Sequence, residues 1–64
     1  MTNILKATRE EQGMSQEELS RKSTVSRTII SNLENFKTDV VTNATLEKIA
    51  KALNKKVVDI FFID

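Results

Sequence analysis

The chain has 64 residues, a formal net charge of +1, and neither cysteine nor histidine. A chain of this length forms one small domain, residues 1–64, and the missing residue types exclude disulfides, thiolate metal sites and histidine acid–base chemistry. No apolar stretch suits a signal peptide or a membrane span, so we expect a cytoplasmic protein. The sequence has no nucleophile–base pair, metal-ligand spacing or phosphate-cradling glycine loop, so we expect no enzymatic activity, cofactor or small-molecule ligand.

The absence of proline and the single glycine favour a mostly helical chain. A first helix is predicted over residues 3–12, and Gly13 ends it, because glycine adopts positive φ without a Cβ clash. The second helix starts at a capping box formed by Ser15 and Glu18. It extends to about Lys22.

The third helix, predicted over residues 26–35, has two faces of different chemistry. At about 100° per residue, Ile29, Ile30 and Leu33 gather on the inner face. The outward face carries short hydrogen-bonding side chains and one arginine: Arg27, Thr28, Ser31 and Asn35, with Asn32 at its edge. A solvated face usually mixes in Glu and Lys, so the absence of any acid on this face marks it as a candidate binding surface.

The rest of the chain is predicted to be helical as well. Thr42 or Asn43 caps a fourth helix, which ends at Leu53. The sequence VVDIFFI at residues 57–63 fits either a short helical turn or, by its β-branched content, a strand. We favour a short helix over Val57–Phe61, because a lone strand would have no partner in a helical chain.

The second and third predicted helices, with their connection, span residues 15–35 and form a helix-turn-helix. In this motif one helix lies across the DNA backbone while the other enters the major groove. Arg, Asn, Ser and Thr side chains suit the donor and acceptor pattern of base edges there. The free N–H groups at the Ser15 end of the second helix favour a phosphate.

Three stretches carry a resemblance to a known family: LKATREEQGMSQEELSRK, VSRTIISNLEN, and TLEKIAKALN with a trailing DIF. Together they resemble the Cro/C1-type helix-turn-helix (XRE) family of bacterial and phage transcription regulators, over Leu5 to about Phe61. The resemblance implies an all-α, compact five-helix, lambda-repressor-like DNA-binding domain. Residues 54–64 would then supply core and dimerisation contacts.

The resemblance also implies roles for individual residues. Arg27, Thr28 and Asn32 match positions that read base edges, and Ser31 lies between them. The expected phosphate contacts are Arg9, Ser15, Gln16, Asn35 and Lys37. Arg9 and Glu34 also match a pair that ties the first helix to the third. Taken alone, the two would form a surface ion pair contributing about 0–1 kcal/mol.

The chain departs from the family pattern at several positions. Ser20 stands where a small alanine is usual, and Thr24 stands where the turn usually has glycine. Phe36 replaces the glycine that usually follows the third helix, and the next loop is longer and lacks its usual proline. A non-glycine residue at positive φ costs about 1 kcal/mol, so we expect some backbone strain at Thr24.

Two functions from different classes remain open. The first is a dimeric regulator, with a repressor as the expected form, that reads a palindromic operator in double-stranded DNA. Three large apolar residues at the end of the chain exceed what one small core covers, so Phe61, Phe62 and Ile63 are candidates for its dimer interface. The alternative is a protein-interaction module, such as an antitoxin or antirepressor, which the low net charge and apolar tail favour.

Overall fold

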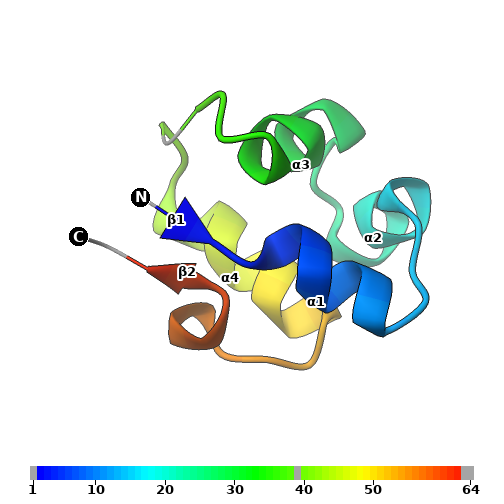
Figure 1. Cartoon of the computed structure of the whole chain (residues 1–64). Helices are drawn as coiled ribbons and strands as arrows, with labels where there is room; N and C mark the ends of the chain where they lie inside the picture. The colour runs from blue at the N-terminus through cyan, green and yellow to red at the C-terminus, as the bar shows by residue number, and fades with distance from the viewer. Residues whose placement is uncertain (1, 39, 63–64) are drawn as a thin grey trace.

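The structure is a computed structural model that describes residues 2–38 and 40–62. In this part of the chain four α-helices lie between two short strands (Figure 1). The elements are β1 (Thr2–Asn3), α1 (Leu5–Glu11), α2 (Gln16–Ser23), α3 (Arg27–Glu34), α4 (Asn43–Ala52), a 3-10 helix (Val57–Asp59) and β2 (Phe61–Phe62). None of the described helices is long and apolar enough to cross a membrane.

The ends of α1 and the start of α2 follow from local chemistry. The helix α1 begins at Leu5, later than predicted, because Asn3 belongs to β1 and its Oδ1 accepts a hydrogen bond from the Leu5 N–H at 3.0 Å. Gly13 has φ +68°, which confirms the left-handed stop after α1. The Ser15 Oγ accepts from the Glu18 N–H at 3.0 Å and so caps α2 as predicted.

Both later helices also start at a hydroxyl cap. The Ser26 side chain accepts from the Ile29 N–H at the start of α3, and Thr42 accepts from the Thr45 N–H at the start of α4. The sequence allowed either Thr42 or Asn43 as the cap of α4, and in the structure the cap is Thr42. These contacts satisfy backbone donors that a helix leaves unpaired in its first turn.

The connection between α2 and α3 holds its shape through side-chain contacts. Thr24 has φ +61°, so the expected left-handed residue stands at the position where the family usually has glycine. The Ser20 hydroxyl donates to the Val25 carbonyl at 2.7 Å, and the Ser23 hydroxyl accepts from the Val25 N–H at 3.2 Å. Ser20 therefore fits by making a hydrogen bond across the turn.

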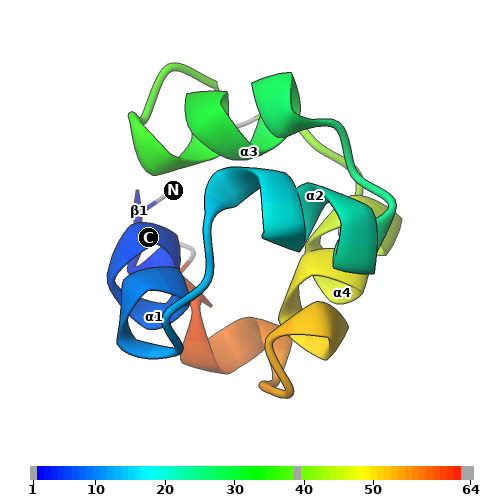
Figure 2. The same ribbon diagram turned by 90° about the vertical axis from the view of Figure 1, so that its right-hand side faces the viewer.

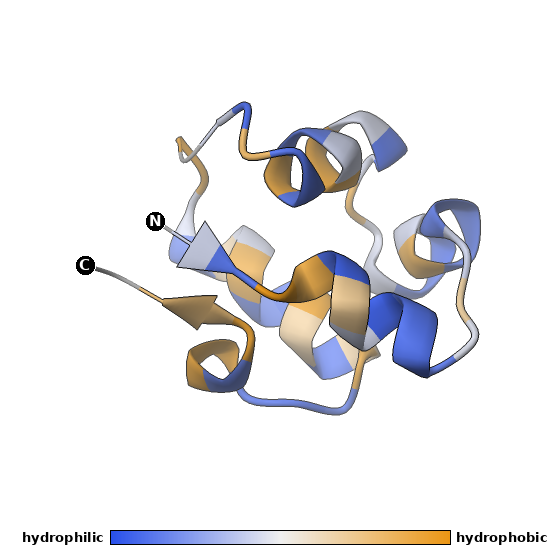
Figure 3. Cartoon of the chain, in the orientation of Figure 1, coloured by the Kyte–Doolittle hydropathy of each residue, from blue (hydrophilic) through white to orange (hydrophobic). Residues whose placement is uncertain are grey.

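The core lies between the helices and includes side chains from all four of them. Figure 3 shows the hydrophobic positions along the inner sides of the helices and throughout β2. The fully buried large residues are Leu5, Leu19, Ile30, Leu33, Ile49, Leu53 and Ile60. The prediction for Ile29 was wrong: the residue is 37% exposed and does not belong to the buried core.

The short helix predicted over Val57–Phe61 is confirmed in part: it is a single 3-10 turn over Val57–Asp59 and not a fifth α-helix. After α4 the described chain forms only the 3-10 helix and then β2, which pairs antiparallel with β1 through Thr2–Phe62 and Asn3–Phe61. The Ile4 N–H also donates to the Ile60 carbonyl at 2.9 Å. The strand therefore has a partner in this helical chain: it is β1, whose Asn3 the sequence placed at the start of the first helix.

The packing leaves α3 along one side of the molecule (Figure 2). The helix α2 packs against both α3 and α4, and α1 packs against α3. The 3-10 helix lies on the side opposite α3 in this view. One face of α3 is therefore anchored by two helices, while its other face carries the exposed residues Arg27 and Thr28.

Candidate nucleic-acid interface

The free face of α3 carries the residues that the sequence proposed as base readers. Arg27 and Thr28 are exposed, and Ser31 and Asn32 are half-buried farther along the same helix. Ile30 and Leu33 from the same helix are fully buried, so the helix has a clear inner side. The four polar residues thus lie on one helix beside the N-terminus of α2.

The acidic residue of α3 is turned into the protein. Glu34 accepts hydrogen bonds from Arg9 Nε at 2.7 Å and from Arg9 Nη2 at 3.0 Å. The exposed fractions of the two side chains are 9% for Arg9 and 1% for Glu34. The interpretation as a surface ion pair was therefore wrong, because the pair is buried and bidentate. Its burial also leaves the outer face of α3 without a negative charge.

Each partner shifts the pKa of the other away from its ordinary value. The hydrogen bond to Glu34 raises the pKa of Arg9, against the opposing effect of burial. Burial alone would raise the pKa of Glu34, but hydrogen bonds from Arg9 and Gln16 and the positive charges of Arg9 and Lys6 together lower it. Both groups are therefore held in their charged forms.

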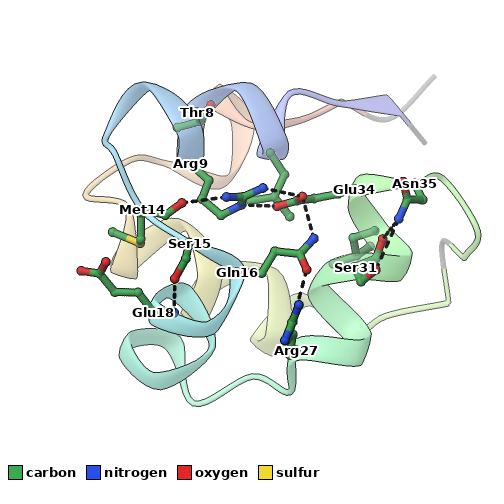
Figure 4. Close-up of polar contacts among 12 residues, drawn as sticks. Thr8, Arg9, Met14, Ser15, Gln16, Glu18, Arg27, Ser31, Glu34 and Asn35 are labelled. Atoms are coloured by element: carbon green, nitrogen blue, oxygen red, sulfur yellow. Dashed lines mark hydrogen bonds and ion pairs between the residues drawn. The ribbon is translucent and has the colours of Figure 1, made fainter.

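Gln16 connects this buried pair to the exposed face of α3 (Figure 4). Its Nε2 donates to Glu34 Oε1 at 3.0 Å, and its Oε1 accepts from Arg27 Nε at 3.4 Å. A continuous chain of contacts thus runs from Arg9 through Glu34 and Gln16 to Arg27. The Arg9–Glu34 link confirms the tie between the first and third helices that the resemblance implied. The two links through Gln16 were not predicted, because no spacing pattern reveals contacts between α2 and α3.

The geometry around Arg9 does not fit the phosphate contact that the resemblance implied. Besides its two bonds to Glu34, Arg9 donates from Nη1 to the Met14 carbonyl at 2.7 Å. This bond also ties α1 to the chain just before α2. Because the guanidinium is buried and has these internal partners, the proposed interface omits Arg9.

The other expected phosphate contacts lie at the two ends of the motif. Ser15 is exposed and Gln16 half-buried at the start of α2, while Asn35 and Lys37 are exposed at and after the end of α3. Asn35 Nδ2 donates to the Ser31 carbonyl at 2.9 Å. The Lys37 N–H donates to the Asn32 carbonyl at 2.8 Å, which fixes the start of the following loop.

The three dimer-interface candidates differ in their positions. Phe61 is buried in the core, which corrects the expectation that its side chain is available to a second copy. Phe62 is 40% exposed, and Ile63 lies outside the described residues. Phe36 and Val40, in the segment between α3 and α4, are exposed large apolar residues that the sequence did not single out for an interface.

Helices α2 and α3, joined by a tight turn and with a polar, acid-free face on α3, define a helix-turn-helix protein. The sequence model of a helix-turn-helix family matches residues 5–60, and the chain belongs to this Cro/C1-type (XRE) family. Its members are DNA-binding transcription regulators, and the family is not normally enzymatic. No curated protein matches the chain significantly.

Proposed function

We propose that the protein is a sequence-specific regulator of transcription that inserts α3 into the major groove of double-stranded DNA. The observation that carries this proposal is the exposed, acid-free face of α3, whose one acid, Glu34, is buried against Arg9. A major groove admits an α-helix, and polar side chains on such a helix can reach base edges.

The proposal assigns the contacts by position. Arg27 and Thr28, at the first turn of α3, and Ser31 and Asn32, one turn later, contact bases. Ser15, Gln16, Asn35 and Lys37 contact phosphates on either side, with the free N–H groups at the start of α2 adding to the attraction. Phosphate contacts fix the orientation of the protein, whereas the base contacts select the sequence.

The active species is proposed to be a homodimer that reads a palindrome. Two copies would place their α3 helices in successive major grooves about 34 Å apart. The exposed side chain of Phe62, together with Ile63, is the proposed contact between the copies. A dimer that occupies a promoter excludes other proteins from the same DNA, so repression is the proposed effect.

Selection from a random duplex pool tests the DNA-binding proposal. Bound sequences should converge on two related half-sites in inverted orientation, and log affinity should fall steeply and linearly with log salt. Sedimentation across a range of concentrations should show a dimer that Phe62→Ser weakens. Absence of salt-sensitive binding to any duplex would contradict the proposal.

The alternative is a module that uses the same fold mainly to bind a protein, as an antitoxin or antirepressor would. The exposed apolar side chains of Phe36 and Val40 favour it, since such residues gather at protein contacts. The salt dependence of the affinity for DNA distinguishes the two functions. A DNA-binding regulator neutralises several phosphates and shows a steep slope, whereas a protein-binding module shows none.

A further inference from the structure

The Gln16 amide lies between a group that only accepts hydrogen bonds and a group that only donates them (Figure 4). The ionised Glu34 carboxylate has no hydrogen to donate, and the Arg27 guanidinium cannot accept one. Turning the amide over would set its oxygen against the carboxylate and its N–H groups against the guanidinium. Both neighbours therefore select the same orientation of Gln16.

The Glu34 carboxylate is a fixed reference for this orientation. Arg9 donates to both of its oxygens, and the Glu34 side chain is 1% exposed. The carboxylate therefore cannot rotate to suit a different Gln16 amide without losing a buried, charge-assisted hydrogen bond. The buried pair in this way fixes the orientation of the Gln16 side chain, which contacts the exposed Arg27.

The contact with Gln16 leaves a defined part of Arg27 free. Within the described residues, the hydrogen bond of Arg27 is made through Nε to Gln16. The two terminal nitrogens, Nη1 and Nη2, take no part in this bond, and in a planar guanidinium they form a pair of parallel donors. Such a pair matches the two acceptors of guanine in the major groove, O6 and N7.

We propose that Glu34, acting through Gln16, sets the base preference of the interface by holding Arg27 end-on toward a guanine. The inference rests on the proposed function, since it assigns a base to a residue of that DNA interface. In this role Arg27 contacts the base, and Glu34 and Gln16 are positioning residues. Adenine at the same position would present an amino donor in place of O6 and face the guanidinium unfavourably.

The test measures affinities of the wild type, Gln16→Met, Arg27→Met and the double variant for the selected operator. The same titrations use duplexes in which the candidate guanine is replaced by adenine or by 7-deazaguanine, which lacks the N7 acceptor. Methionine keeps the length of glutamine without its amide. The wild type should lose about 5- to 140-fold in affinity on the adenine duplex, and less, in the same direction, on 7-deazaguanine.

Coupling between the two residues distinguishes positioning from an independent contact. Gln16→Met and Arg27→Met should each bind the guanine and adenine duplexes equally, within about twofold, and the double variant should lose no more discrimination than Arg27→Met. A Gln16→Met variant that keeps the full guanine preference, while losing affinity equally on every duplex, would overturn the role of Gln16.

A second variant tests Glu34 without leaving a buried charge unpaired. Arg9→Met/Glu34→Met removes both members of the pair, and thermal unfolding of each variant identifies those that fold. The folded double variant should lose the guanine preference as Gln16→Met does. If this variant keeps the preference, the role of Glu34 is refuted.

Gln12→Met is the matched control. The Gln12 amide, at the C-cap of α1, also donates a hydrogen bond, but to the Leu53 carbonyl at the end of α4, at 2.8 Å. This variant should keep the guanine preference. If the wild type binds no duplex, the proposed function itself fails. If it binds a selected operator in which Arg27→Met changes no preference for guanine, only the present inference is overturned.

Discussion

At the scale of single residues, Glu34 contacts both the buried Arg9 and Gln16, the residue that reaches the surface of α3. Its carboxylate neutralises the buried Arg9 guanidinium, and it also fixes Gln16, which contacts Arg27. A buried ion pair is not in itself a strong source of stability, because desolvation offsets much of the attraction. The pair is nevertheless costly to break, since either charge left alone is buried without compensation.

Arg9→Met should therefore lower the free energy of unfolding by about 3–5 kcal/mol, because it leaves the Glu34 carboxylate buried and unpaired. Arg9→Met/Glu34→Met should be considerably more stable than the single variant. Urea unfolding followed by circular dichroism measures both. A single variant as stable as the double variant would contradict this assignment.

The lowered pKa of Glu34 gives stability a pH dependence. An unfolded glutamate titrates at about 4.3, so below that pH the unfolded chain binds a proton before the folded protein does. The contribution of Glu34 is complete above that pH and is lost as pH falls through its lower folded pKa. Urea unfolding in this acid range should show that the free energy of unfolding falls more steeply with falling pH for the wild type than for Arg9→Met/Glu34→Met. Equal dependence on pH in the two proteins would contradict the role of Glu34.

Thr24 provides a direct measure of backbone strain in the turn between α2 and α3. Thr24→Gly should be more stable than Thr24→Ala by about 1 kcal/mol, since only glycine adopts positive φ without a Cβ clash. Both substitutions remove the hydroxyl, so their difference isolates the backbone. Equal urea midpoints for the two variants would show that the turn relaxes.

At the scale of elements, the helix starts depend on single hydroxyl groups. Ser26→Ala should cost about 1 kcal/mol, because it removes the acceptor for the Ile29 N–H at the start of α3, whereas Ser26→Gly should cost a few tenths. Urea unfolding of the two variants tests this difference. Equal losses would mean that the cap does not hold the first turn of α3.

Local signals predicted the elements that depend on neighbouring residues. The cap at Ser15 and the stop at Gly13 were confirmed, and Thr42 is the cap of the two proposed for α4, because each depends on contacts within a few residues. The β1–β2 pair was missed, because its partners are at opposite ends of the chain. A two-residue strand has no periodicity to recognise.

The same limit applies to the candidate site. The free face of α3 could be predicted from the helical repeat, and Arg27 and Thr28 are exposed as expected. The burial of Glu34 could not be predicted, because it depends on how α1 packs against α3. The contact of Gln16 with Glu34 likewise requires the three helices to be assembled.

At the scale of the whole molecule, a chain with a formal net charge of only +1 still offers a surface suited to DNA. Burial of Glu34 removes a negative charge from α3, while Arg27 and Lys37 remain exposed near its two ends. The local field, rather than the total charge, governs attraction to phosphates. The α3 side is therefore the part of the molecule on which the proposed function depends.

The most direct test of that claim compares wild type and Arg27→Ala by fluorescence anisotropy at one fixed salt concentration, on the selected operator and on its single-base variants. The variant should bind the operator about 1–3 kcal/mol more weakly and lose discrimination at one base pair of each half-site. Unchanged affinity, with the same base preference at every position, would show that Arg27 does not read a base and would contradict the central contact of this account.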